Sequence, residues 1–139
     1  MKNIFVDTNI LVDLIADRKP FSKNAIGIFK LAEAKKINLF TSSHSIATTY
    51  YLLSKYVDQK KLREVLLGLM EVVQVVEIDQ QILKQALMSN FKDVEDAIQL
   101  FCASSKSKME CIITRNLKDF KTSRIKVLSP EVFLEQMNK

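Results

Sequence analysis

Five short apolar segments alternate along the chain with longer stretches in which apolar residues recur every three or four positions. The short segments span residues 3–6, 38–41, 72–78, 111–114 and 125–128. Runs of this kind are typical of strands buried on both faces, and the longer stretches predict helices. Strands separated by helices form βαβ units. We therefore expect an α/β fold, a three-layer α/β/α sandwich around a mainly parallel sheet of four to five strands.

Capping residues mark the helix starts. We expect helices over about residues 9–16, from 22, over 43–56, from 58, over 79–89, over 93–106 and from 130. Short polar side chains accept hydrogen bonds from first-turn amides, so we expect caps at Ser22, Asp58, Asp79 and Ser129.

Length and composition indicate one domain, residues 1–139, with an ordinary core. Hydrophobic residues make up 47% and charged residues 27%, as in soluble globular proteins. No apolar run is long enough to span a bilayer, and the first residues lack a signal-peptide pattern. We therefore expect a cytoplasmic protein with no membrane partner. Cys102 and Cys111 are expected to be reduced core residues.

Glycine content argues against one class of site. The two glycines, Gly27 and Gly68, both lie in helical stretches. No loop has the glycines that wrap backbone amides around a phosphate, which argues against P-loop and dinucleotide-binding chemistry. The net charge of +5 is compatible with a polyanionic partner.

Acidic residues follow strands or begin a helix. Asp7 stands where the first strand meets the next helix, and Asp119 comes just after the fourth strand. Asp93 and Asp96, three apart, share one flank of a helix, whereas Glu95 is expected to point elsewhere. Taken singly, Asp93 is explained as a helix cap and Asp119 as a cap or a lysine's partner.

Four polar side chains nevertheless map to one edge of the sheet, where ligands bind in such folds. They are Asp7, Asp96, Asn116 and Asp119. Crowded carboxylates repel one another unless they are protonated or bound to a cation. Oxygen donors without His or Cys favour Mg²⁺ or Mn²⁺, and such an ion activates water beside a phosphoryl group. An acidic pocket in a basic protein therefore predicts phosphodiester hydrolysis.

Four segments together resemble the PIN domain family over essentially the whole chain. They are IFVDTNILVDL, DVEDAIQLFCA, CIITRNLKDF and IKVLSPEVFL. PIN domains are metal-dependent ribonucleases, and the small bacterial ones are commonly VapC-like toxins of toxin–antitoxin pairs. The resemblance implies that Asp7 and Asp96 bind the metal.

The resemblance extends to neighbouring positions. It implies that Thr8 and Asn9 shape the hydrogen bonds of the corner, and that Asn116 and Asp119 occupy the acidic position after the fourth strand.

One position departs from the family pattern. Many PIN domains have a glutamate on the helix after the second strand, where this chain has Thr48. Thr48 offers one neutral oxygen, so we expect a lower metal affinity unless Asp93 makes up the charge. The departure motivates an alternative function, a catalytically weak or inactive module that binds RNA or protein.

Other residues near the edge have simpler interpretations. His44 is expected to be a cap or surface residue and not a general base. Arg115 and Lys118 are expected to bind RNA phosphates, and this binding should weaken as the salt concentration rises. We also expect a homodimer, because residues 50–53 and the stripe Leu62, Leu66 and Leu69 are more apolar than one small sheet face requires. The helices that carry them are expected at or near its interface.

The leading hypothesis is an endoribonuclease that depends on Mg²⁺ or Mn²⁺ and acts as a toxin, with RNA as substrate and an antitoxin as partner. A phosphatase of the haloacid-dehalogenase type is a less favoured alternative, because that family usually has a second acid where this chain has Asn9.

Overall fold

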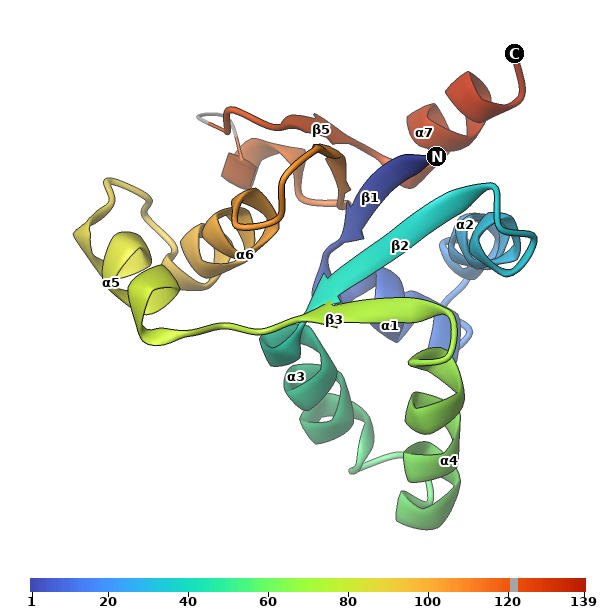
Figure 1. Ribbon diagram of the computed structural model, residues 1–139. Helices are drawn as coiled ribbons and strands as arrows, with labels where there is room; N and C mark the ends of the chain where they lie inside the picture. Colours follow the sequence, from blue (N-terminus) through green and yellow to red (C-terminus); the bar gives the residue numbers. More distant parts are fainter. Residues whose placement is uncertain (121–122) are drawn as a thin grey trace.

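The structure is a computed structural model that describes residues 1–120 and 123–139 (Figure 1). Five strands form one sheet in the order β3-β2-β1-β4-β5, and every neighbouring pair is parallel. The strands are β1 (Lys2–Val6), β2 (Ile37–Ser42), β3 (Val73–Val76), β4 (Met109–Ile113) and β5 (Lys126–Leu128). All five predicted strands are present, and the parallel α/β fold is confirmed.

Helices cover both faces of the sheet (Figure 1). One apolar cluster contains side chains of α1 (Thr8–Ile15), α2 (Ser22–Glu33), α3 (Ser43–Leu53), α4 (Gln59–Leu69) and α7 (Pro130–Met137). A second cluster, on the opposite face, contains side chains of α5 (Gln80–Met88), α6 (Val94–Ser104) and the 3₁₀ helix η1 (Leu117–Phe120). These two clusters are the cores of the three-layer sandwich.

Strand β1 is buried on both faces of the sheet, which explains why polar and apolar residues do not alternate in its sequence. Ile4 and Val6 belong to the first cluster and Phe5 belongs to the second, and all three side chains are fully buried. In the parallel registers, Phe5 is paired with Phe40 of β2 and Ile112 of β4. A central strand with apolar layers on both faces has no solvent side for polar residues.

The strand order reverses beside β1. The chain adds β2 and β3 on one side of β1, then returns and adds β4 and β5 on the other side. Such a switch point leaves a crevice at the carboxyl ends of the strands. Asp7 directly follows β1 and therefore lies at this crevice.

Three of the four predicted caps are present. Asp58, Asp79 and Ser129 accept hydrogen bonds from backbone amides in the first turns of α4, α5 and α7, at 3.1, 2.9 and 3.2 Å. The prediction for Ser22 was wrong, since α2 begins at Ser22 itself and the N-cap is Phe21, without a side-chain capping bond. The Ser22 amide already donates to the Arg18 carbonyl.

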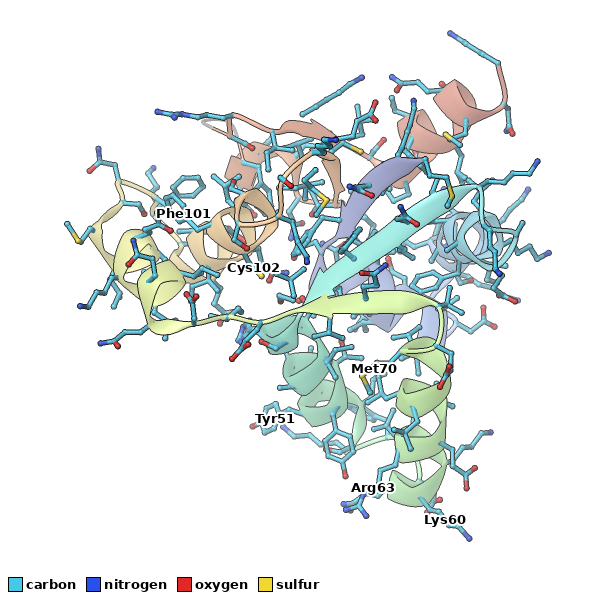
Figure 2. The ribbon with its side chains drawn as sticks, viewed as in Figure 1. Tyr51, Lys60, Arg63, Met70, Phe101 and Cys102 are labelled. Atoms are coloured by element: carbon cyan, nitrogen blue, oxygen red, sulfur yellow. The ribbon has the colours of Figure 1, made fainter. Side chains whose placement is uncertain are left out.

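The cysteines are buried free thiols, as predicted. Cys102 points from α6 toward β3, where its Sγ lies 3.6 Å from the Val76 carbonyl oxygen (Figure 2). Burial raises the pKa of Cys102 to about 12 and that of Cys111 to about 11, so both remain protonated at neutral pH.

The leucine stripe of α4 lies in the core of its own chain. Leu62, Leu66 and Leu69 are at most 7% exposed and pack in the first cluster with Leu53 and Val73. The apolar periodicity was correctly identified, but α4 uses it to pack against its own chain. No helix in the described part of the chain is long and apolar enough to cross a membrane.

Candidate active site

Asp7 is held at the end of β1 by hydrogen bonds to both of its oxygens. Its Oδ1 accepts from the Thr8 amide at 2.8 Å and from Gln99 Nε2 at 2.9 Å. Its Oδ2 accepts from Thr114 Oγ1 at 2.8 Å and from Asn9 Nδ2 at 3.4 Å. The residue is only 6% exposed. These donors compensate the burial of the carboxylate and fix its orientation.

A buried group of polar side chains supports Asp7 from α3 and α6. Gln99 Nε2 also donates to Ser45 Oγ at 2.8 Å, and Gln99 Oε1 accepts from Ser42 Oγ at 2.5 Å. Ser45 Oγ lies 2.8 Å from Thr8 Oγ1. The group therefore joins the carboxyl ends of β1 and β2 to both helices.

Gln99 was not predicted as a site residue, although the sequence carries a signal for it. Gln99 lies three residues after Asp96 and six after Asp93, so it continues the flank that carries both aspartates. A polar residue that continues an acidic flank into the buried part of a helix is a candidate partner for a carboxylate.

The loop after β4 carries two predicted residues, Asn116 and Asp119, and is connected to Asp7 through Thr114. Thr114 Oγ1, which donates to Asp7, accepts hydrogen bonds from the Asn116 amide at 3.0 Å and from Asn9 Nδ2 at 3.2 Å. The Asp119 amide donates to the Asn116 carbonyl at 3.1 Å and begins the turn of η1. Thr8 and Asn9 thus form the corner hydrogen bonds that the family resemblance implied.

These segments enclose a pocket of about 300 Å³ at the switch point. Its acidic side chains are Asp7, Asp93, Glu95, Asp96 and Asp119. Its remaining lining is Thr8, Asn9, Val12, Arg18, His44, Thr48, Leu52, Gln99 and Asn116. The structure therefore gathers the predicted acidic residues, Asn116 and Thr48 around one space.

The pKa of Asp96 is raised by its position in this pocket. Burial of its side chain raises the pKa of Asp96 to about 7, and the charges of Asp93, Asp119, Asp7 and Glu95 add to the effect. In the metal-free protein a neutral Asp96 is therefore well populated near pH 7. A bound cation would remove the repulsion and favour the ionised form.

Of the predictions about the acidic helix, the one for Glu95 was wrong and the one for Asp93 as a helix cap is confirmed. Glu95 does not point away from the site but lines the pocket, where its Oε2 lies 3.6 Å from His44 Nε2. Glu95 follows the helix start, so its long side chain reaches across to α3. Asp93 lines the pocket and also caps α6, since its Oδ1 accepts from the Glu95 amide at 2.8 Å.

His44 and Thr48 form the opposite wall of the pocket. His44 Nε2 lies 3.4 Å from Thr48 Oγ1. His44 was expected to be a cap or a surface residue. It is not the cap, because Ser42 is the N-cap of α3 and accepts a hydrogen bond from the Ser45 amide at 2.9 Å, and the His44 side chain is 35% exposed. Thr48 is one turn after His44 and faces the same space, as its match to the family's glutamate position requires.

The two predicted RNA-binding cations have different surroundings. Lys118 is exposed and lines an adjoining hollow of about 210 Å³ together with Asp93, Asp96 and Asp119. Arg115 instead forms an ion pair with Asp13, a partner that the sequence did not predict. Arg18, also not identified from sequence, lines the acidic pocket itself.

The donor set suits a hydrated divalent ion. Within residues 1–120 and 123–139, no three His, Cys, Asp or Glu side chains are close enough together to hold a metal ion as they stand. Mg²⁺, however, usually keeps several waters and takes only one or two carboxylates directly. Asp7, Asp96 and Asp119 surround a space of the size that such an ion with its waters needs.

The fold and the pocket together define an α/β protein with an acidic site at the switch point of a parallel sheet. A sequence model of the PIN domain matches residues 3–118, so the chain belongs to the PIN domain family. Over 99% of its length the chain is 31% identical to ribonuclease VapC1 of Aquifex aeolicus (strain VF5), of which it covers 96%.

Solved structures give the same result for the fold. The chain superposes with a TM-score of 0.67 on a chain of a toxin–antitoxin complex from Klebsiella pneumoniae, with 28% identity and coverage of 91% of this chain and 97% of the other. It superposes with a TM-score of 0.69 on a chain of DNA-bound VapBC from Salmonella typhimurium, with 18% identity and coverage of 94% and 99%.

Proposed function

We propose that this protein is an endoribonuclease that depends on Mg²⁺ or Mn²⁺ and acts as the toxin of a toxin–antitoxin pair. The observation that carries the proposal is the convergence of Asp7, Asp96 and Asp119, from three separate segments, on one pocket. The similarity to a VapC ribonuclease and to a chain of a toxin–antitoxin complex supports it.

The side chains around the pocket divide into three roles. Asp7 and Asp96 would hold the cation, with Asp93 adding negative charge beside them. Asp119 and Asn116 complete the catalytic set from the opposite segment. When bound, the cation supplies a more acidic water and polarises a phosphoryl oxygen of the RNA.

The hydrogen bonds of Asp7 prepare it for this role. Because four donors already fix the carboxylate, it does not need to reorient when the cation binds. Asp96 differs, since its pKa of about 7 means that cation binding near neutral pH competes with a proton.

Cations near the pocket would bind the RNA backbone. Lys118 is exposed beside the acidic residues, and Arg18 lines the pocket. Contacts of this kind to phosphates position a strand without reading its sequence, and they weaken as salt rises.

The direct test is cleavage of structured and unstructured RNAs by the purified protein in Mg²⁺, Mn²⁺ or EDTA. Cleavage is expected with either metal and not with EDTA. Asp96→Asn is expected to bind RNA without cutting it, because it loses the charge that holds the cation. Glu64→Gln, an exposed change on α4 away from the pocket, is the matched control and should cut as the parent does.

The same experiment tests the alternative function. Thr48 lines the pocket in place of a glutamate, which favours a module with weakened catalysis. If the parent protein binds RNA but cuts none of the substrates with either metal, the enzyme proposal fails and the binding module replaces it.

A cognate antitoxin and a cytoplasmic location complete the proposal. The product of a neighbouring short gene, co-expressed with this chain, should co-purify with it and suppress cleavage. Full cleavage activity in a stable complex of the two proteins would contradict the antitoxin assignment.

A further inference from the structure

Arg115 is enclosed on two sides by its own chain. Its Nε donates to Asp13 Oδ2 at 2.7 Å and its Nη2 donates to Asp13 Oδ1 at 3.0 Å. The Asp13 side chain is 1% exposed, and Arg115 Cζ lies 3.9 Å from the centroid of the Phe21 ring. The pair with Asp13 occupies the Nε–Nη2 edge of the guanidinium, and the ring covers one of its faces, which leaves only the Nη1–Nη2 edge for a phosphate.

The backbone of Arg115 lies within the loop that builds the site. Thr114, directly before it, donates to Asp7, and Asn116, directly after it, begins the turn that carries Asp119. The Arg115 amide itself lies 3.4 Å from Asn9 Oδ1 and donates to it. The side chain of Arg115 is therefore an anchor at the centre of this loop.

We propose that Arg115 is a positioning residue and not an RNA contact. Its ion pair with Asp13 attaches the loop after β4 to α1 and holds Thr114 and η1 against Asp7. The inference rests on the proposed function, because the loop that is anchored carries Asp119 of the metal-dependent site.

Because Asp13 is buried, its ion pair with Arg115 tolerates little change in geometry. A buried carboxylate without a partner is strongly unfavourable, so Asp13 holds the guanidinium in one place. Only the planar fork of arginine matches both oxygens of the carboxylate, whereas lysine offers a point charge. Arg115→Lys therefore keeps the positive charge and loses the anchor.

Two variants separate the anchor from a phosphate contact. Arg115→Lys keeps a cation at this position, and Asp13→Asn keeps the arginine while removing its counter-charge. Mn²⁺ affinity is measured by calorimetry, and RNA affinity is measured in EDTA over a range of salt concentrations. If Arg115 positions the loop, both variants should lose about tenfold in Mn²⁺ affinity, as is usual for residues that orient metal ligands. Their salt dependence of RNA binding should equal that of the parent.

Lys118→Ala is the contrasting control. It should keep the parent's Mn²⁺ affinity and lose about one phosphate contact, which lowers the slope of log K against log salt by roughly 0.7 on single-stranded RNA. If Asp13→Asn fails to fold, the double variant Asp13→Asn, Arg115→Gln buries no charge and is measured in its place.

The outcomes are distinct. Unchanged Mn²⁺ affinity in both variants, with stronger RNA binding by Asp13→Asn, would show that Arg115 contacts phosphate and would overturn the positioning role alone. A parent protein that binds no Mn²⁺ would overturn the proposed function and the positioning role together.

Discussion

Both oxygens of Asp7 accept hydrogen bonds from donors of the surrounding segments. Asparagine has nearly the same shape, but its amide nitrogen would face donors in either orientation. The substitution therefore removes the charge and also places two donors against each other.

Asp7→Asn should thus lower Mn²⁺ affinity sharply and reduce the free energy of unfolding by about 1–3 kcal/mol. Calorimetry measures the first effect and urea unfolding measures the second, with Glu64→Gln as the control for both. Equal Mn²⁺ affinity in variant and parent would remove Asp7 from the metal site.

Asp96 predicts a pH dependence of stability. The pKa of Asp96 is about 7 in the folded protein, against an ordinary value of 3.8 for the free side chain, so between these pH values the folded state binds a proton that the unfolded state has released. The contribution to stability is complete below pH 4 and is lost as pH rises through 7. In EDTA, Asp96→Asn should therefore lose less stability than the parent between pH 5 and pH 8. Thermal unfolding at the two pH values provides the measurement, and parallel behaviour of both proteins would contradict the raised pKa.

Thr49 predicts a stabilising substitution. Among the described residues, Thr49 Oγ1 is a buried side-chain atom without a hydrogen-bond partner. Thr49→Val should raise the free energy of unfolding by about 1 kcal/mol, since it removes an unsatisfied hydroxyl. Thr41→Val is the matched control, because Thr41 Oγ1 donates to the Val6 carbonyl at 2.9 Å and its loss should destabilise by about as much. Urea unfolding of both variants should give changes of opposite sign.

At the scale of elements, α6 connects the acidic flank to the core. Its first turn carries Asp93 and Asp96, and Gln99, one turn further, reaches Asp7 and the serines at the start of α3. Gln99→Met keeps the length of the side chain and removes all three hydrogen bonds. Mn²⁺ affinity should fall by about tenfold, as for other residues that orient a ligand. Gln81→Met, on the exposed face of α5, should leave Mn²⁺ affinity unchanged.

The elements and much of the site could be predicted from sequence because they depend on local pattern. Apolar runs predict the strands. Because the carboxyl ends of parallel strands lie at one edge of the sheet, the sequence also predicts that Asp7, Asp96 and Asp119 lie close together there. Glu95 and Arg115 could not be assigned in this way. Their positions depend on side-chain reach toward His44 and Asp13, which belong to other segments that only tertiary packing brings close.

At the scale of the whole molecule, α3, α4 and α5 expose large apolar side chains. Tyr51, Tyr56 and Leu67 are 63%, 84% and 63% exposed, and Met70 lies at the end of α4 (Figure 2). On α5, Leu87 and Met88 are 70% and 84% exposed. Because α3 and α4 pack against each other, their exposed apolar side chains are the candidates for a surface that binds another protein.

We expect a homodimer that uses the surface of α3 and α4. Leu67→Lys should shift the protein toward monomer, because it places a charge in the contact, whereas Leu87→Lys on α5 should leave the dimer intact. Light scattering at tens of micromolar measures the mass. A monomeric parent at this concentration would contradict the expectation.

The position of β1 between β2 and β4 has a consequence for synthesis of the chain. Asp7 is made before its partner Thr114, which lies 107 residues later in the chain. Until β4 has been added beside β1, a growing chain has the first carboxylate without the loop that completes the pocket. If the protein is the ribonuclease proposed above, a chain that stops before β4 cannot assemble the pocket and should not cut RNA.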